Sequence, residues 1–511
     1  MGSSILSALV ISPTILLLPL FSALGAPFTF ETVEGKAKQQ ASKAYSAPAP
    51  LEKSLSELDY DGYRLIRSSQ ENTLWAEQEL PFRLQFMHPG YRFLKPVKMN
   101  IVDYDGNSSP LAFDKKYFDY KDIPELEKTQ FDVDGFAGFR ILHPLNDVQG
   151  QYDELGSFVG ASYFRLLGKD QSYGISARGL ALNSVTPGAA EEFPDFTEYW
   201  FIQPKPEDKS FTLYALLDSP SVTGAYRFII HPGETTRAAI TVSLFFRKEV
   251  KCLGLAPLTS MFWYGENHRE RTFPDWRPEV HDSDGLLLKY RNQQTLWRPL
   301  YNHHAIRNAL FNAKELVGYG LLQRDRDFNN YQDLGNPQHR APSTWVEPSG
   351  EWPSGGIRLI ELPTNNEAMD NIVSFYQPAQ SPKAGDSLRY SYCLCWEKTH
   401  EQQLSPNQVI ATRIEKLPGT ETLRRFVLDF SGPDLNKLPD NTNITAEVSS
   451  TGGTKVTETQ CFKNPHTGGW RVAFILDLNQ NPTQPTQIHC LLKDLPNQTN
   501  LSEIWSYQWT P

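Results

Sequence analysis

The sequence predicts an all-β protein built from two successive β-sandwiches. Between about residues 60 and 375, short segments alternate apolar and polar residues and end at Gly, Pro, Asp or Asn, as in PFRLQFMHPG and GAYRFIIHPG. Helical periodicity is scarce over the same stretch. A second group of strand-like segments follows over roughly the last 120 residues. Many short antiparallel strands without internal repeats are typical of large β-sandwiches.

The domain organisation follows from a change in composition near residue 380. The segment YQPAQSPKAGDS, residues 376–387, is rich in Pro, Gly and Ala, as linkers are. Beyond it, LRYSYCLCW, TLRRFVLDFSG and WRVAFILDLN give strands whose size and spacing match an immunoglobulin-like sandwich. We expect a β-sandwich domain over 27–380 and an immunoglobulin-like domain over 381–511. Residues 27–58 predict one short helix followed by an arm.

The first 26 residues predict a secretory signal peptide. A long apolar stretch is followed by small residues, the order found in signals. The alternative is an uncleaved membrane anchor, because Ile5 to Leu24 is about long enough to span a bilayer. Pro13 and Pro19 within the stretch, and its Ala/Gly end, favour the signal. We therefore expect a soluble mature protein outside the cytoplasm.

Charge and metal-ligand patterns exclude several function classes. The chain carries 49 Lys and Arg against 59 Asp and Glu, a net charge of −10 without a basic stripe, so no nucleic-acid partner is expected. The sequence has no CxxC pair and no HExxH or HxH spacing, so neither a metal site nor a cofactor is expected. The five cysteines either pair in part within the last 120 residues or stay as buried thiols.

Two acidic loops carry the candidate chemistry. The segment HDSDGL begins at residue 281, directly before an apolar strand, and suits a turn, a metal loop or an acid/base centre. A calcium loop would need more oxygen ligands, which makes metal the weakest of the three. The second loop, in ELPTNNEAMDNIV, holds Glu361, Glu367 and Asp370. Glycoside hydrolysis needs two carboxyl groups, one protonated and one ionised, and an aromatic-rich secreted β-protein with two such loops fits that requirement.

Long motifs in a fixed order resemble those of one known family. They include GFAGFRILHPLN, YGISARGLALN, EEFPDFTEYW, YALLDSPSVTGAYRF, LAPLTSMFWYGEN, RPEVHDSDGL, GYGLLQRDRDF and ELPTNNEAMDNIV. From about residue 28 to 509 the chain resembles the periplasmic glucan biosynthesis proteins of Gram-negative bacteria, the OpgG/OpgD (MdoG/MdoD) family. A Sec-like leader, in place of a twin-arginine one, resembles the G-type members. The resemblance implies a galactose-mutarotase-like β-sandwich followed by an immunoglobulin-like domain, and a periplasmic location.

The resemblance also implies an activity and the residues that carry it. Members act on β-1,2-glucan, and some are inverting β-1,2-glucanases, which use no metal or cofactor. Asp370 matches the family's general acid, and Asp282 matches the general base of the D-type members, which reaches the nucleophilic water through a relay. Glu367 matches a carboxylate that supports the substrate site. We expect Glu367, as a like charge, to raise the pKa of Asp370, and Ser283 or backbone N–H groups to keep Asp282 ionised.

Further residues near these loops are candidate substrate contacts. His281 and Asp284 flank Asp282 in the same hexapeptide, and His281 suits a hydrogen-bonded partner better than a catalyst. Aromatic residues near the loops are candidate platforms on which a sugar ring could stack; these are Trp263, Tyr264, Trp345 and Trp352.

One departure from the family pattern leaves the reaction open. Where relatives usually carry a Tyr and, three residues on, an Arg, this chain has Gln338 and Ala341. The main hypothesis is an inverting β-1,2-glucanase of osmoregulated periplasmic glucan synthesis. The alternatives are a transglycosylase, or a non-catalytic glucan-binding scaffold that partners the membrane glucan glucosyltransferase. Chain-length preference and a homodimeric state are left open.

Overall fold

Strands dominate the computed structural model, which describes residues 26–146, 148, 150–266, 274–398, 405–452, 454–478 and 485–510. About 46% of the chain is strand and 8% is helix, so the all-β prediction is confirmed. The predicted signal peptide, residues 1–26, lies outside the described residues except for Ala26.

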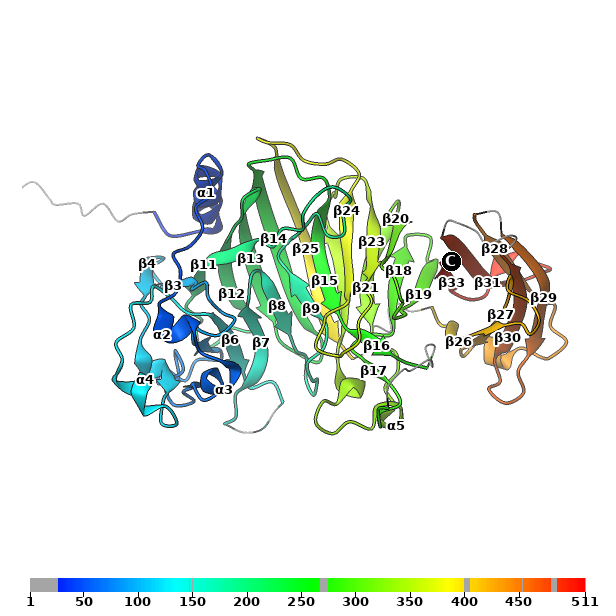
Figure 1. Cartoon of the computed structure of the whole chain (residues 1–511), viewed down its shortest axis with the longest axis horizontal. Helices are drawn as coiled ribbons and strands as arrows, with labels where there is room; N and C mark the ends of the chain where they lie inside the picture. The colour runs from blue at the N-terminus through cyan, green and yellow to red at the C-terminus, as the bar shows by residue number, and fades with distance from the viewer. Residues whose placement is uncertain are drawn as a thin grey trace, which may run out of the picture.

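Two large sheets form the main body (Figure 1). The first runs in the order β2 (Arg83–Met87), β6 (Gly138–His143), β7 (Asp153–Val159), β8 (Tyr163–Leu166), β9 (Ser176–Arg178), β15 (Leu253–Ser260), β24 (Ile372–Pro378), β23 (Gly355–Glu361) and β20 (Arg307–Asn312), with β10 (Ala181–Leu182) also on β15. The second contains β19 (Thr295–Pro299), β18 (Gly285–Tyr290), β21 (Leu316–Leu322), β22 (Ser343–Ser349), β25 (Ser387–Glu397), β14 (Thr236–Phe246), β13 (Val222–His231), β12 (Phe211–Asp218), β11 (Asp195–Ile202), β3 (Lys98–Val102) and β4 (Ser108–Leu111).

The core of the main body lies between these two sheets. Phe139 of β6 packs edge-on against Tyr199 and Phe201 of β11, with ring centroids 5.0 and 4.7 Å apart. Phe158 of β7 meets Phe228 of β13 in the same way at 5.4 Å. Apolar and polar residues alternate along each strand, so each strand buries one face. The apolar faces of the two sheets then meet and form a sandwich.

A smaller sandwich follows at the C-terminal end. Its own sheet comprises β26 (Gln408–Lys416), β27 (Leu423–Ser431), β30 (Trp470–Asp477) and β29 (Lys455–Lys463). This sheet packs on β28 (Ile444–Ser450), β31 (Thr486–Asp494) and β33 (Ile504–Trp509), with β32 (Thr499–Asn500) beside β31. The ring of Phe426 contacts those of Trp505 and Tyr507 across the gap. Because β33 pairs in parallel with β19, the second large sheet continues into the small sandwich.

Strand β25 shows where the chain leaves the main body. It pairs with β14 on one side and with β22 on the other, inside the second large sheet. The Pro/Gly/Ala-rich segment before it therefore crosses from β24 in one large sheet to β25 in the other. Gly385 makes the turn at a φ of 88°, in the left-handed region that glycine favours. We propose that the division between the two domains follows β25, after residue 397, instead of lying near residue 380.

The predicted N-terminal helix is present as α1 (Phe30–Ala41). It buries Phe30, Val33 and Ala37 against the outer face of the second large sheet, beside Trp200. The remaining short elements are α2 (Lys53–Ser56), α3 (Tyr60–Tyr63), α4 (Pro124–Lys128), α5 (Phe328–Tyr331), the 3₁₀ turns Lys115–Tyr117, Gln338–Arg340 and Leu435–Lys437, and the two-stranded pairs β1 (Arg67–Ser68) with β5 (Phe118–Asp119) and β16 (Phe262–Tyr264) with β17 (Val280–His281). Within the described ranges, no helix is long and apolar enough to cross a membrane.

The five cysteines are all free thiols, in agreement with one of the two predicted alternatives. The Sγ atoms of Cys393 and Cys395 lie 3.9 Å apart on one face of β25. Cys490 is buried in the core of the small sandwich, and Cys461 packs against the same core.

Candidate active site

Asp282 is positioned by the short ribbon of β16 and β17. Phe262 of β16 lies opposite His281 of β17, and the backbone N–H of Asp282 donates to the carbonyl of Met261 at 2.9 Å. The ribbon hangs below the large sheets in Figure 1. The Asp282 side chain is thereby fixed directly at the end of a strand, half-buried.

Asp370 lies at the end of the loop 362–371 that joins β23 to β24. The next residue, Asn371, is buried and clamps this loop to β16. Its Oδ1 accepts from the N–H of Phe262 at 2.8 Å, and its Nδ2 donates to the carbonyls of Phe262 and Leu362 at 3.0 and 2.9 Å. Phe262 therefore pairs in register with the residue before Asp282 and forms hydrogen bonds with the residue after Asp370. This joint brings together two carboxyl groups that are far apart in the sequence.

A second amide side chain fixes the start of the same loop. Asn302 donates to the carbonyls of Trp263 and Thr364 at 3.0 and 2.8 Å and accepts from the N–H of Thr364 at 3.0 Å. The loop is thus tied to the β16 segment at both ends. Such a loop holds its carboxylates in position before a ligand binds.

The two carboxyl groups interact electrostatically. Burial and the nearby negative charge of Asp370 raise the pKa of Asp282 to about 7. Partial desolvation also raises the pKa of Asp370, whose side chain is exposed at the surface, against the opposing charges of Arg178 and Arg165. Arg178 is itself buried on β9, where its Nε donates to Thr259 at 3.0 Å. Two carboxyl groups and two guanidinium groups therefore share one site.

Gln338 contributes to the surroundings of Asp282. Its side chain is fully buried, and it lowers the pKa of Asp282 as the charge of His281 does. Gln338 thus lies next to the expected base, at the position where the resemblance implies a Tyr. An amide can donate or accept a hydrogen bond there but has no proton to exchange near neutral pH.

His281 is a buried structural partner of this centre. It has no exposed surface, and its Nε2 and Nδ1 lie 2.9 and 3.0 Å from Oε2 of Glu279 and Oε1 of Gln323. Burial alone would lower its pKa, but Glu279 and Asp284 outweigh it and raise the pKa of His281. The structure thus gives His281 no surface for a substrate. Its positive charge instead favours the ionised form of the neighbouring Asp282.

Asp284 and Ser283 also make contacts other than the expected ones. The carboxylate of Asp284 accepts from the backbone N–H groups of Arg324 and Asp325 at 2.9–3.0 Å and so caps the end of β21. The hydroxyl of Ser283 bonds that of Ser260 at 2.7 Å. Because this hydroxyl is taken up by Ser260, Ser283 is not among the groups that lower the pKa of Asp282.

Glu367 does not raise the pKa of Asp370 as expected, because it is paired with an arginine. Arg277 donates to Oε2 of Glu367 at 2.6 Å and also bonds Asp275 and Asp333. The negative charge of Glu367 is therefore offset by the positive charge of the adjacent Arg277. Its position ties the middle of the loop 362–371 to the segment that leads into β17.

The chain that forms this site also matches a known protein family. Residues 28–509 match the family model described as "Periplasmic glucan biosynthesis protein, MdoG". The chain belongs to this family. The resemblance seen in the sequence motifs, and its leaning to the G-type, is therefore confirmed.

Relatives of this MdoG-family chain extend over nearly its whole length. The "Glucans biosynthesis protein G" of Pseudomonas paraeruginosa (strain DSM 24068 / PA7) is 38% identical over 492 residues, 94% of this chain and 92% of that relative. The protein of the same name from Pseudomonas aeruginosa (strain LESB58) matches with the same identity and coverage. A crystal structure of the collagen adhesin from S. aureus covers 54% of this chain and 86% of its own at 9% identity, but its TM-score of 0.12 supports no inference.

The aromatic residues expected to stack on sugar are mostly unsuited to it. Trp345 and Tyr264 are 0% and 2% exposed, so neither presents a ring to a ligand. Trp352 is half-buried before β23, where its Nε1 donates to the carbonyl of Ser391 at 2.8 Å. It lies at the opposite end of the β23–β24 hairpin from Asp370, about 20 Å away along the strand. Trp263 is half-buried beside Tyr264 and is the one of the four that keeps an exposed part near the site.

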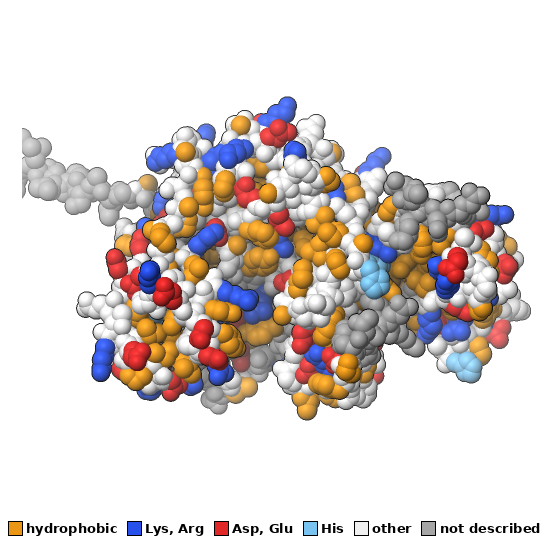
Figure 2. Space-filling model, in the orientation of Figure 1, with side chains coloured by type: hydrophobic (Ala, Val, Ile, Leu, Met, Phe, Trp, Pro, Cys, Tyr) orange, Lys and Arg blue, Asp and Glu red, His pale blue; other side chains and the backbone are white. Residues whose placement is uncertain are grey.

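Exposed aromatic rings that the sequence analysis missed lie beside the arginines instead. Arg165 stacks on Tyr173 with 3.9 Å to the ring centroid, and Arg178 lies 5.4 Å from that of Phe193. Trp276, 68% exposed, directly precedes Arg277. Figure 2 shows the surface hollowed below β8 and β9, with Lys and Arg side chains inside the hollow. The sequence contained a signal for Trp276, because this residue belongs to the WRPEVHDSDG motif. No sequence rule, however, distinguishes an exposed ring from a buried one there.

The Glu367–Arg277 pair gives a test of how the loop is held. We expect Glu367→Ala to lower turnover of glucan, the activity proposed below, about tenfold. The melting temperature should change little, because Arg277 keeps Asp275 and Asp333 as partners. Glu367→Gln should restore most of the turnover, because its amide oxygen still accepts from Arg277. Steady-state kinetics and thermal melting measure both. Glu351→Ala, an exposed glutamate at the other end of the β23–β24 hairpin, is the matched control. Equal losses in the Ala and Gln variants would contradict a positioning role.

Among the described residues, no group of three or more His, Cys, Asp or Glu side chains is arranged to hold a metal ion.

Proposed function

We propose that this protein is a periplasmic enzyme of glucan synthesis that hydrolyses β-1,2-glucan with inversion at the anomeric carbon. Asp370 acts as the general acid that protonates the leaving oxygen. Asp282 acts as the general base that activates water, directly or through a relay that includes a substrate hydroxyl. The observation that carries this proposal is the electrostatic interaction of Asp282 with Asp370, whose loops are held together through hydrogen bonds to β16.

The coupling favours a state in which the pair holds one proton. The negative charge of Asp370 is one cause of the raised pKa of Asp282, after burial. When Asp370 carries a proton, that cause disappears and Asp282 ionises more readily, with help from the positive charge of His281. One protonated and one ionised carboxyl group are what inverting hydrolysis requires. The two titrations then belong to the pair and not to either residue alone.

The surroundings of the pair suit a sugar chain. Arg165, Arg178 and Tyr163 offer donors close to Asp370, and sugar hydroxyls accept such bonds. The exposed faces of Tyr173 and Phe193, each beside an arginine, are apolar surfaces on which the C–H face of a glucosyl ring can lie. A neutral polymer with alternating polar and apolar faces matches this mixture.

Gln338 supports a second candidate, a glucan-binding scaffold that hands chains to or from a membrane glucosyltransferase. A buried amide beside Asp282 cannot pass on a proton, so a relay that runs through this position is interrupted. In that case the same cleft binds glucan without cleaving it.

Proton NMR of linear β-1,2-glucan incubated with the purified protein tests the proposal. We expect new reducing ends that appear first as the α-anomer, the product of inversion. New linkages without a net gain in reducing ends would replace the hydrolase with a transglycosylase. Binding of glucan with no change in its spectrum would favour the scaffold.

A further inference from the structure

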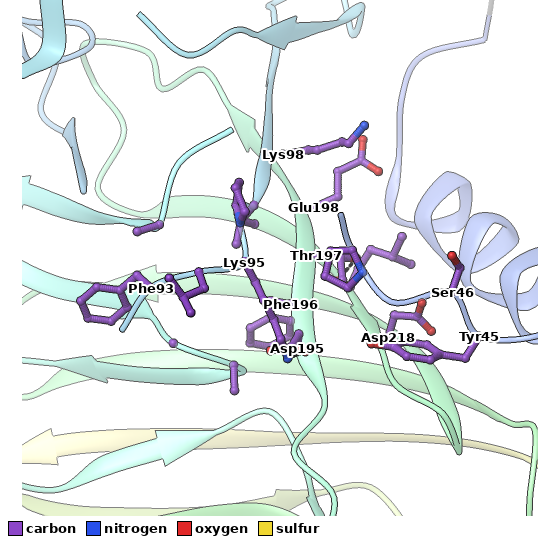
Figure 3. Close-up of a pocket in the computed structure, with 18 of the residues that line it drawn as sticks. Tyr45, Ser46, Phe93, Lys95, Lys98, Asp195, Phe196, Thr197, Glu198 and Asp218 are labelled. Atoms are coloured by element: carbon purple, nitrogen blue, oxygen red, sulfur yellow. Dashed lines mark hydrogen bonds and ion pairs between the residues drawn. The ribbon is translucent and has the colours of Figure 1, made fainter. Parts of the chain in front are cut away.

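A second cavity lies apart from the two carboxyl groups, at the N-terminal end of the main body. It has a volume of about 610 Å³, within the roughly 300–1,000 Å³ common for ligand sites. Its walls come from the arm after α1, the loop 92–98 before and into β3, residues 160–161, and the neighbouring ends of β11 and β12 (Figure 3). The wall residues that the argument uses are Tyr45, Phe93, Lys95, Asp195, Glu198 and Asp218.

Five of the six charged side chains that line this cavity are already in ion pairs. Three cations, Arg92, Lys95 and Lys98, and three carboxylates line it. Lys95 lies 2.7 Å from Asp195, which is 13% exposed, and Lys98 lies 2.7 Å from Asp134. A cavity with no charge in excess offers little to an ion, so a neutral ligand fits best.

The other two carboxylates are held in fixed positions. Glu198 accepts from Lys36 at 2.7 Å and from Asn100 at 3.0 Å. Asp218 accepts from Arg247 at 2.5 Å and from Gln40 at 2.6 Å. Each carboxylate has more lone pairs than these bonds use, so it can still accept from a hydroxyl group without moving.

Apolar surface completes the lining. Phe93 is half-buried and Leu94 is 42% exposed on one side, and Tyr45 of the arm lies on the other, next to Asp218 (Figure 3). The Tyr45 ring is half-buried, so part of it is exposed at the cavity wall. Aromatic faces alternating with fixed hydroxyl acceptors form a surface for a sugar ring.

The cavity also adjoins the cleft that contains Asp370. The N–H of Phe196 donates to the carbonyl of Ala161 at 3.0 Å, and both residues line the cavity. Tyr163 follows Ala161 by two residues and Phe193 precedes Asp195 by two, and both of these rings lie beside Arg178. A polymer that leaves the cleft over Phe193 therefore meets the cavity next.

We propose that this cavity is a distal binding site for the glucan chain, which holds glucosyl units remote from the reacting bond. The inference rests on the proposed function, since it takes the same polymer as ligand. A distal site predicts that long glucan chains bind more tightly than short ones, because only long chains reach and contact the cavity.

The test uses the full mature chain carrying Asp370→Asn, so that glucan is bound and not consumed. Calorimetry with long β-1,2-glucan should show about five- to tenfold weaker binding for Tyr45→Ala and for Phe93→Ala, the size expected for one lost aromatic contact. Binding of a β-1,2-linked glucose disaccharide should not change in either variant. Phe462→Ala, which removes an exposed ring from the small sandwich, is the matched control and should bind as the parent does. Unchanged affinity for the long chain, or equal losses for both ligands, would overturn the distal site.

Hydrogen exchange with and without long glucan separates this inference from the proposed function. Protection of both 42–48 with 92–98 and the loop 362–371 supports the two together. Protection of the loop alone overturns the distal site and leaves the proposed function standing. Protection of 42–48 and 92–98 alone supports the distal site and contradicts the placement of the active site, and protection of neither overturns both.

Discussion

Asp370→Asn should reduce glucan turnover by about 10²–10⁴-fold, the usual contribution of a positioned general acid. The amide has the size of the carboxyl group but has no acidic proton to give to the leaving oxygen. Binding of β-1,2-glucan should persist, because Arg165, Arg178 and the exposed rings remain and one negative charge beside them is removed. Initial rates of reducing-end release and calorimetric binding measure the two quantities separately.

Asp132→Asn is the control for this prediction, since it makes the same chemical change at an exposed aspartate outside the site. It should leave both quantities as they are. Loss of binding in Asp370→Asn would mean that the carboxylate holds substrate and does not act as an acid. Turnover at the parent rate would remove Asp370 from the mechanism.

Asp282→Asn should reduce turnover by a similar factor of about 10²–10⁴ and should also change the pH dependence of stability. The carboxyl group titrates near 3.8 when unfolded and near 7 when folded. Between these values the folded state holds the proton more tightly, so the free energy of unfolding of the parent falls as pH rises from about 4 to about 7. The asparagine variant lacks this loss.

The melting temperature of Asp282→Asn relative to the parent should therefore rise as the pH is raised from 5 to 8. Thermal melts at several pH values measure this difference, and Asp132→Asn again serves as the control. In the parent, the profile of kcat/KM against pH should report the coupled titration of the pair. A difference in melting temperature that is flat across this range would show that Asp282 is ionised throughout in the folded protein.

The sequence could predict both acidic loops because each stands beside a strand signal. HDSDGL directly precedes an apolar run and EAMDN lies between two apolar runs, and the family motifs single out Asp282 and Asp370 within them. It could not predict the partners that fix these loops. Asn302 and Asn371 are ordinary polar residues in the sequence, and their importance comes from bonds to β16, whose position depends on long-range folding.

The aromatic residues show the same limit. Trp345 and Tyr264 stand close in sequence to the acidic loops, and proximity along the chain suggested contact with substrate. Burial is decided by which face of a strand meets another layer, and β22 turns Trp345 into the core shared with the small sandwich. Phe193 and Tyr173, far from both loops in sequence, are the rings that the fold leaves exposed beside the arginines.

By itself, the sequence determined the all-β class, the N-terminal helix and the family, because alternation, turn residues and long motifs are local properties of the chain. The tertiary structure alone decided that β25 belongs to the large sheet, through pairing with β14 and β22. It also decided the pairing of Glu367 with Arg277 and the interaction of Asp282 with Asp370. Each of these depends on distances between residues that are remote in sequence, and such distances are set by packing of the whole chain.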